Sequence, residues 1–251
     1  MTGSKVTEAQ EIVANAKRIV AFTGAGISTE SGLSDFRSPG GLWTKYRVVT
    51  HQEFVSSEEA RKEYWDMRSE LIPMILSVEP NEGHKVLAEM EAAGRLSAVI
   101  TQNIDGLHQV AGSRNVIELH GTNRSASCLS CKKSWEIEII QGRLEDGERD
   151  LRCDVCGGLI DPDTVSFGQS MPEEAMSRAH EEVSRCDLMF MIGSSLEVYP
   201  AAFFPRLAHQ NGARLIFVNK TRTPYDGIAD LIERGPIGPF MRLAWGEFDK
   251  S

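Results

Sequence analysis

The sequence predicts an α/β protein with a doubly wound parallel sheet and a small inserted metal-binding module. Short apolar runs rich in β-branched residues alternate with segments of helical period, which is typical of parallel sheets covered by helices. Each run leads into polar residues or glycine, where ligands bind in such sheets. One polar stretch that carries four cysteines interrupts the alternation, which indicates an insertion.

The apolar runs are expected to be buried strands, because continuous apolar runs of this length are typical of strands covered on both faces. They occupy residues 18–24, 97–103, 115–119, 187–193 and 214–219. Helical periodicity is clear at 58–76, 83–94 and 172–186, and the polar residues 1–18 also favour a helix. We therefore predict a sheet domain from residues 1–121 and 161–251, with a small helical segment at 38–80 and a module at 122–160.

Composition places the chain among ordinary globular proteins. It has 251 residues, of which 41% are hydrophobic and 25% charged, enough to bury a full core. The N-terminus lacks the apolar core of a signal peptide, and no apolar run approaches the roughly 20 residues of a membrane span, so a cytoplasmic location without membrane contact is expected. A net charge of -9 disfavours broad nucleic-acid binding and mildly favours basic polypeptide partners, although such a charge often serves only solubility.

Four cysteines predict a structural zinc site. Cys128 and Cys131 form one CxxC pair, and Cys153 and Cys156 form a second at the spacing of a zinc ribbon. Four thiolates fill a tetrahedral Zn²⁺ and leave no position for catalysis. Two disulfides or four unrelated thiols are the alternatives, and Cys186 is expected to be a buried small hydrophobe.

The stretch after the first run is rich in glycine. Gly24 and Gly26 permit a tight turn and a close approach to a pyrophosphate. A dehydrogenase fingerprint would place a third glycine at Thr29 and an acidic residue about 20 positions further on, and both are missing. The following Asp35-Phe36-Arg37 could contact a phosphate and a flat ring, or could be an ordinary loop held by its own contacts.

Taken in order, the motifs resemble the sirtuin family of NAD-dependent protein lysine deacylases. They are GAGIST, DFR, TQNID at 101–105, His120-Gly121, the two CxxC pairs, VSFG at 165–168, GSSLEV at 193–198 and FVN at 217–219. The resemblance extends over residues 10–243. It implies a Rossmann-like domain with a zinc-ribbon insert, NAD as co-substrate, and transfer of an acyl group from lysine to ADP-ribose with release of nicotinamide.

The resemblance also implies roles for individual residues. His120 would be the catalytic base, and Asn103 would orient the ribose and the attacking water. The other residues expected to contact NAD are Gly24, Ala25, Gly26, Ser28, Thr29, Asp35, Phe36, Arg37, Trp43, Gln102, Ile104, Asp105, Gly193, Ser194, Ser195, Asn219 and Ile237. Without the resemblance, the QNID segment could be a plain helix cap.

An acylated lysine in a protein or peptide is the implied partner. Its backbone would pair between two segments, which include Val165, Phe167, Gly168, Glu197 and Val198, although ordinary core strands would also fit these residues. Trp65 and Arg68 align with the residues that select acidic acyl groups in some members. An exposed helix arginine beside a packed tryptophan is the simpler interpretation, so deacetylation is expected to dominate.

Three departures from the family pattern, Ser34, Gln169 and Asp161-Pro162, remove no catalytic group. The alternative functions are desuccinylation or demalonylation, protein ADP-ribosylation in the same NAD cleft, and NAD sensing without catalysis. Asn103, Asp105 and His120 argue against the last of these. The sequence does not decide the oligomeric state or the physiological substrate.

Overall fold

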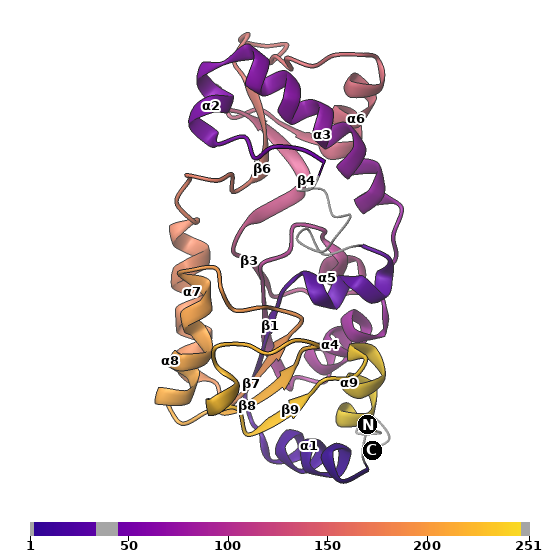
Figure 1. Cartoon of the computed structure of the whole chain (residues 1–251), viewed down its shortest axis with the longest axis vertical. Coiled ribbons are helices and arrows are strands. Elements are labelled where there is room, and N and C mark those ends of the chain that lie inside the picture. Colours follow the sequence, from indigo (N-terminus) through magenta and orange to yellow (C-terminus); the bar gives the residue numbers. More distant parts are fainter. Residues whose placement is uncertain (1–2, 34–44, 247–251) are drawn as a thin grey trace.

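The computed structural model describes residues 3–33 and 45–246. Figure 1 shows the order of the elements along the chain. The helices are α1 Gly3–Asn15, α2 His51–Ser56, α3 Glu58–Leu76, α4 Glu82–Ala92, α5 Leu107–Val110, α6 Ile137–Glu145, α7 Glu173–Arg185, α8 Phe204–Gln210 and α9 Ile237–Trp245. The strands are β1 Ile19–Thr23, β2 Leu96–Thr101, β3 Val116–Glu118, β4 Gly121–Cys128, β5 Ser134–Glu136, β6 Ile160–Thr164, β7 Leu188–Ile192, β8 Arg214–Val218 and β9 Leu231–Glu233. Short 3₁₀ turns, η1 Ala25–Ser31, η3 Ala201–Phe203 and η4 Asp226–Ile228, complete the described part.

A parallel sheet forms the larger half of the molecule. Its strand order is β3-β2-β1-β7-β8-β9, and all five predicted strands lie in it. β1, β7 and β8 are buried along almost their whole length, as their continuous apolar runs predict. The sixth strand, β9, was not predicted, because its two apolar residues lie between charged residues and form no apolar run.

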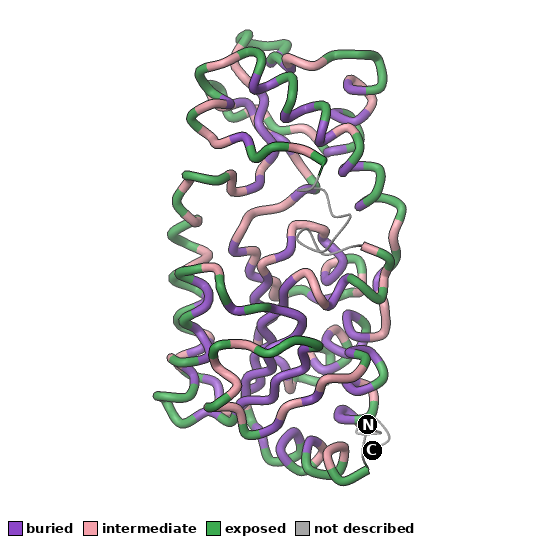
Figure 2. Tube along the Cα trace, in the orientation of Figure 1, coloured by how far each residue is buried: buried purple, intermediate pink, exposed green. Residues whose placement is uncertain are grey.

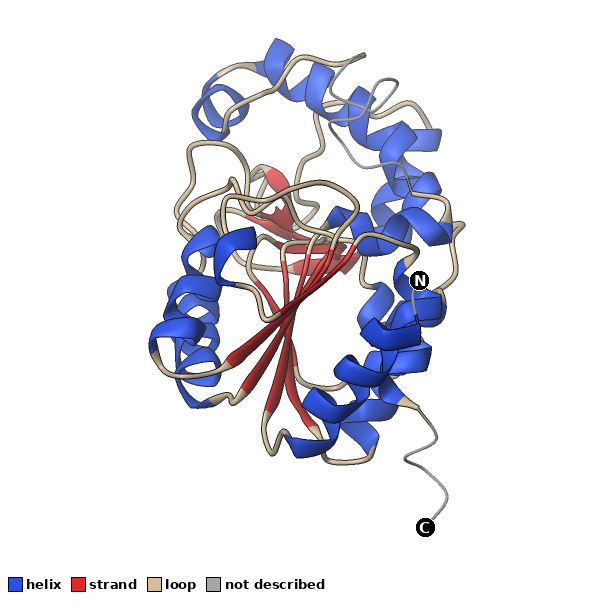
Figure 3. Cartoon of the chain, turned by 60° about the horizontal axis from the view of Figure 1, so that its bottom comes forward, coloured by secondary structure: helices blue, strands red, loops and turns tan. Residues whose placement is uncertain are grey.

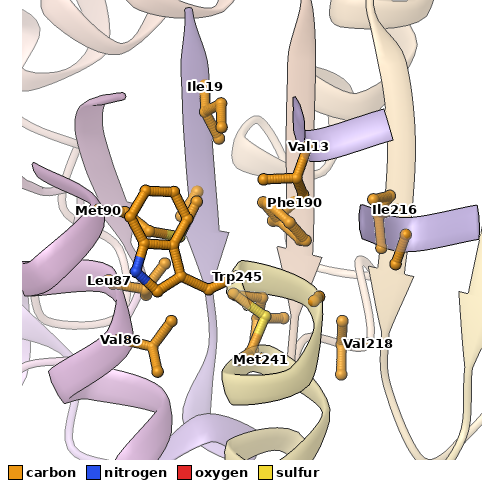
Figure 4. Close-up of a cluster of buried hydrophobic side chains, with 14 of the residues drawn as sticks. Val13, Ile19, Val86, Leu87, Met90, Phe190, Ile216, Val218, Met241 and Trp245 are labelled. Atoms are coloured by element: carbon orange, nitrogen blue, oxygen red, sulfur yellow. The ribbon is translucent and has the colours of Figure 1, made fainter. Parts of the chain in front are cut away.

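Helices cover both faces of this sheet (Figure 3). One face packs against α1, α4 and α9, where Trp245 and Met241 of α9 lie near Leu87 and Met90 of α4 (Figure 4). The other face packs against α7 and α8. The doubly wound α/β architecture is therefore confirmed, and the predicted helices 58–76, 83–94 and 172–186 correspond to α3, α4 and α7.

A second, antiparallel sheet of order β5-β4-β6 lies above the first, with α2, α3 and α6 around it (Figure 1). One hydrophobic core joins α2 and α3 to the cysteine-containing part of the chain. It includes Phe54, Trp65, Ile72, Ile140 and Ile160, and Figure 2 shows the buried segments at this end. The helical segment thus packs with the inserted module, while the limits of the domains stay a prediction.

Local capping explains where α2 and α3 begin. The Thr50 hydroxyl accepts a hydrogen bond from the Glu53 amide, and the Glu53 carboxylate accepts one from the Thr50 amide, which is a capping box. Ser57 caps α3 by accepting from the Ala60 amide at 3.2 Å. These side chains fix the entry of both helices into the shared core.

None of the described helices combines the length and the apolar character that a membrane crossing requires.

Candidate functional site

The predicted site residues that the structure describes gather mainly where the strands of the large sheet end. The chain builds the sheet outward from β1 through β2 to β3, and then returns to the other side of β1 and continues outward through β7, β8 and β9. The strand order therefore reverses between β1 and β7. Such a switch point opens a crevice beyond the carboxyl ends of the strands. The segments that enter it follow β2, β1, β7 and β8, beginning with Gln102, Gly24, Gly193 and Asn219.

Glycines at the switch point allow two loops to touch. The Gly26 amide donates to the Gly193 carbonyl at 2.8 Å, and the Gly24 amide donates to the Ile192 carbonyl at 3.0 Å. A Cβ on Gly26 would lie 2.6 Å from the Gly193 Cα, and one on Gly24 would lie 2.8 Å from the Gly193 oxygen. These glycines are therefore required by the contact between the two loops, in addition to the expected approach of a pyrophosphate.

Three polar side chains at this edge form one hydrogen-bonded chain. The side-chain amide of Asn103 donates to the Gly24 carbonyl and to the Ser28 hydroxyl, both at 3.2 Å. Ser28 donates to the Asp105 carboxylate at 2.7 Å, and the other oxygen of Asp105 accepts from the Leu107 amide at 3.0 Å. Burial raises the pKa of Asp105, while the hydrogen bonds from Leu107 and Ser28 oppose that rise. Asp105 thus binds the first amide of α5, as a helix cap would, and also fixes Ser28.

His120 follows β3 and faces the same loop. Its Nδ1 lies 2.9 Å from the Gln102 carbonyl oxygen, which accepts hydrogen bonds and cannot donate them. Nδ1 therefore carries the proton, and Nε2 has a lone pair. Burial lowers the pKa of His120, and the Gln102 carbonyl partly opposes this. The imidazole is therefore neutral near pH 7 and has the tautomer of a base at Nε2.

The remaining predicted NAD contacts take varied positions. Ser194 is buried and donates to the Gln102 side-chain oxygen at 2.9 Å, whereas Ser195 is exposed. Asn219 is buried and donates to the Thr221 carbonyl at 3.0 Å. Ile237 starts α9 within the sheet core, and the Glu30 carboxylate accepts hydrogen bonds from its amide at 2.6 Å. Predictions on Asp35, Phe36, Arg37 and Trp43 lie outside the described residues.

The two predicted substrate segments are irregular in backbone. Val165 donates to the His120 carbonyl at 2.8 Å, so the first segment begins directly beside the histidine. Phe167 is exposed, and its carbonyl accepts from the His51 amide at 3.0 Å. In the second segment Leu196 adopts a left-handed φ of 56°, while Glu197 is exposed and Val198 half-buried. Core strands, the simpler interpretation, are therefore wrong for both segments.

Arg68 corrects one expectation. It is buried, not exposed, because the antiparallel sheet covers this face of α3. Its guanidinium donates to the Tyr64 hydroxyl at 2.6 Å, to the Asn123 oxygen at 2.7 Å and to the Thr164 hydroxyl at 2.5 Å. Trp65 is fully buried and packs edge-on against Phe54. The guanidinium of Arg68 is occupied by partners within the protein, which offers no support for recognition of an acidic acyl group.

The four predicted metal ligands meet in one cluster. All their Sγ atoms lie within 4.8 Å of one another, and the thiols are free. Sγ separations of 3.5 Å for Cys128 and Cys156 and 3.6 Å for Cys131 and Cys153 are too long for disulfides and suit tetrahedral zinc ligation. Cys186 lies apart, and burial raises the pKa of its thiol to about 12, as befits a structural cysteine.

Sequence reasoning missed a buried polar group behind the site. Thr23 and Thr101 end strands β1 and β2, and the Thr23 hydroxyl is hydrogen-bonded both to the Thr101 hydroxyl and to His108. The only signal in the sequence is a threonine at the end of each strand, Thr23 before Gly24 and Thr101 before Gln102, and a strand pattern alone also explains it.

Comparisons with known proteins agree with this geometry. The Sir2 family model matches residues 24–200. An NAD-dependent protein deacetylase of Thermodesulfovibrio yellowstonii is 53% identical over 238 residues, covering 95% of this chain and 93% of the relative, and one of Sulfolobus acidocaldarius is 44% identical, covering 92% and 90%. A solved structure of a Sir2 with a p53 peptide and NAD+ superposes with a TM-score of 0.86 at 39% identity, covering 94% of this chain and 95% of that one. Another, of a Sir2 variant with a deacetylated p53 peptide and 3'-O-acetyl ADP ribose, gives 0.89 at 40%, covering 95% and 96%.

Proposed function

Because the chain belongs to the Sir2 family, we propose that it is an NAD-dependent protein lysine deacetylase that transfers the acetyl group to ADP-ribose and releases nicotinamide. The observation that carries the proposal is the state of His120. Its Nδ1 proton is held by the Gln102 carbonyl at 2.9 Å, so Nε2 is left to accept a proton. Burial keeps the imidazole neutral.

NAD would supply an electrophilic ribose carbon with nicotinamide as its leaving group. The loops at the switch point fit such a ligand, because their backbones approach each other closely at glycines and lie beside polar side chains. Gly24, Ala25, Gly26, Ser28 and Thr29 would bind from the first loop. Contacts from the other loops would come from Gln102, Asn103, Ile104, Asp105, Gly193, Ser194, Ser195, Asn219 and Ile237, together with Asp35, Phe36, Arg37 and Trp43.

Asn103 would orient the ribose, since its side chain is already fixed by the Gly24 carbonyl and Ser28. The acyl-lysine peptide would lie between Val165–Gly168 and Glu197–Val198. Neither segment lies in a strand of the two described sheets, and we expect an extended peptide to pair with their backbones as an added strand. Weak sequence selectivity follows, because backbone pairing does not depend on side chains.

The proposal includes an acetyl preference, one structural zinc on the four cysteines and a cytoplasmic location. The occupied guanidinium of Arg68 supports the acetyl preference. The net charge of -9 supports the absence of broad nucleic-acid binding.

The test is incubation of the full chain with NAD and acetyl-, succinyl- and malonyl-lysine peptides, with mass spectrometry of the peptide and of the small-molecule products. We expect deacetylated peptide, nicotinamide and acetyl-ADP-ribose in equal amounts. His120→Ala should lose this activity, and the matched control His180→Ala, an exposed histidine on α7, should keep it. Radiolabelled ADP-ribose bound to protein without deacetylation would overturn the proposal in favour of ADP-ribosylation, and a higher kcat/KM for succinyl-lysine would overturn the acetyl preference.

A further inference from the structure

A line of buried hydrogen bonds runs beneath the loop that follows β2. The Thr23 hydroxyl donates to the Thr101 hydroxyl at 2.8 Å, and it lies 2.9 Å from the His108 Nε2. Thr23 is fully buried, and Thr101 and His108 are no more than 2% exposed. Hydroxyls and imidazoles buried this deeply would be costly without partners, so the bonds constrain where these groups can lie.

Thr101 and His108 are the two ends of one functional loop. Thr101 is the last residue of β2, and His108 lies in the first turn of α5. Gln102, Asn103, Ile104 and Asp105 lie between them, and all four are expected NAD contacts. The hydroxyl of Thr23 therefore joins the start of this loop to its end, from the neighbouring strand β1.

The start of the loop is fixed further by its own backbone. The backbone amide of Asn103 donates to the Thr101 hydroxyl at 3.0 Å, and the backbone amide of Gln102 donates to the Thr23 carbonyl at 3.0 Å. These bonds set the direction in which the chain leaves β2, and hence where the Asn103 side chain meets Ser28. A shift at Thr101 would be passed directly to Asn103.

The direction of the hydrogen bonds identifies His108 as a donor. Thr23 uses its single proton on Thr101, so the contact with His108 requires a proton on Nε2. The His108 Nδ1 then bears a lone pair and has no partner in the described part of the chain. Burial and the neighbouring His84 hold the pKa of His108 well below its usual value, so the ring is neutral.

His84 provides an internal contrast. Its ring centroid lies 4.8 Å from that of His108 and it is equally buried, but neither of its nitrogens has a hydrogen-bond partner among the described residues. Burial lowers the pKa of His84 to about 4. Only one histidine of the pair is therefore connected to the loop.

We propose that Thr23 is a positioning residue that holds both ends of the Gln102–Asp105 loop, through Thr101 and His108, in the geometry that the reaction requires. This inference rests on the proposed function, since it concerns the same site. Thr23 itself touches no reacting group and acts through the loop.

The test compares Thr23→Val, which keeps the β-branched shape and loses the hydroxyl, with Thr23→Ser, which keeps the hydroxyl. With NAD and an acetyl-lysine peptide, Thr23→Val should lower kcat roughly tenfold to a hundredfold, as expected when reacting groups are displaced. Its KM for NAD should rise and its KM for the peptide should stay unchanged, because the peptide segments lie on other loops. Thr23→Ser should restore kcat and both KM values.

A merely structural role would give a different pattern. Partial unfolding lowers the concentration of active enzyme, so the apparent kcat falls while neither KM changes, and that result would overturn the proposal. His108→Leu should reproduce the effect of Thr23→Val, and His108→Gln, which retains a side-chain donor, should reduce it. These variants serve as the test if Thr23→Val does not fold.

Two matched controls remove buried polar groups that have no hydrogen-bond partner in the described part of the chain. Ser113→Ala deletes a buried hydroxyl without a described partner, and His84→Leu replaces the unconnected histidine. Both should keep the wild-type kcat and KM for NAD, and a loss equal to that of Thr23→Val would overturn the proposal. Activity of the wild-type chain distinguishes the two proposals: its absence refutes the function, whereas an active wild type with an unchanged Thr23→Val refutes only the positioning role.

Discussion

Replacing Gly193 by alanine should destabilise the protein at the point where the β1 and β7 loops meet. Gly193 has a left-handed φ of 61°, and a Cβ there would lie 2.3 Å from the Ile27 nitrogen and 2.6 Å from the Gly26 carbonyl carbon. Both neighbours are backbone atoms, which cannot rotate away. The substitution therefore combines an unfavourable backbone conformation with a steric clash.

The two costs can be assigned magnitudes separately. The left-handed conformation costs a residue with a Cβ about 1–2 kcal/mol, and overpacking in a rigid interior costs about 1–3 kcal/mol. Alanine also restricts the unfolded chain, which returns about 0.4–1 kcal/mol. We expect Gly193→Ala to lower the free energy of unfolding by about 1–4.5 kcal/mol.

Two other glycines isolate these contributions. Gly212 has a φ of 87° with no atom within 4 Å of a Cβ, so Gly212→Ala should cost only the conformational part, about 1 kcal/mol. Gly26 has no left-handed φ, but a Cβ there would lie 2.6 Å from the Gly193 Cα, so Gly26→Ala measures the clash. Urea unfolding of the three variants, followed by far-ultraviolet circular dichroism with zinc present, gives each free energy. The reasoning fails if Gly193→Ala costs no more than Gly212→Ala.

Three further predictions concern titration and metal binding. Since burial lowers the pKa of His120 below 6.5, kcat/KM should stay level down to about pH 6.5 and fall only as the pH drops through the lowered pKa; a pH profile with an acid limb centred above 6.5 would contradict this. A strong chelator should remove one zinc per chain, lower the melting temperature and abolish activity, because the four thiols support the core shared by α2, α3 and α6; full activity at a zinc content near zero by atomic absorption would count against it. Burial raises the pKa of Asp161 from 3.8 to about 7, so the folded state binds more protons than the unfolded state between these values and loses stability as the pH rises through them. Asp161→Asn should therefore raise the free energy of unfolding at pH 8 by roughly 1–3 kcal/mol and have little effect at pH 4, and equal effects in urea titrations at both pH values would disprove the assignment.

The architecture of the large sheet could be predicted because its strands carry their own signal. Runs such as residues 187–193 are apolar on both faces, and only a strand buried between helices satisfies that pattern. β9 has only two apolar residues, which lie between charged ones, and α6 lies in a charged stretch, so neither shows a pattern. Their places are determined by packing against elements far away in the sequence.

The site residues were predicted from the order of the motifs along the sequence, and not from contacts between residues in the fold. His120 could be identified by its place in the series, but its tautomer depends on the Gln102 carbonyl, which only the fold brings near. Arg68 shows the opposite outcome. An arginine on a helix was expected to be exposed, and the partners that bury it, Asn123 and Thr164, are too far away in the sequence for a local pattern to show.

The central position of β1 has a consequence for how the chain acquires its fold during synthesis. β1 is made first but pairs on one side with β2 and on the other with β7, which is made only after the whole cysteine module. Until β7 leaves the ribosome, the backbone groups on one edge of β1 are unpaired, and the helices around Trp65 lack the core that the later residues 126–160 complete. Such long-range pairing slows folding and exposes nascent chains to aggregation. The same strand order that creates the crevice therefore leaves the growing chain exposed to aggregation until β7 has been made.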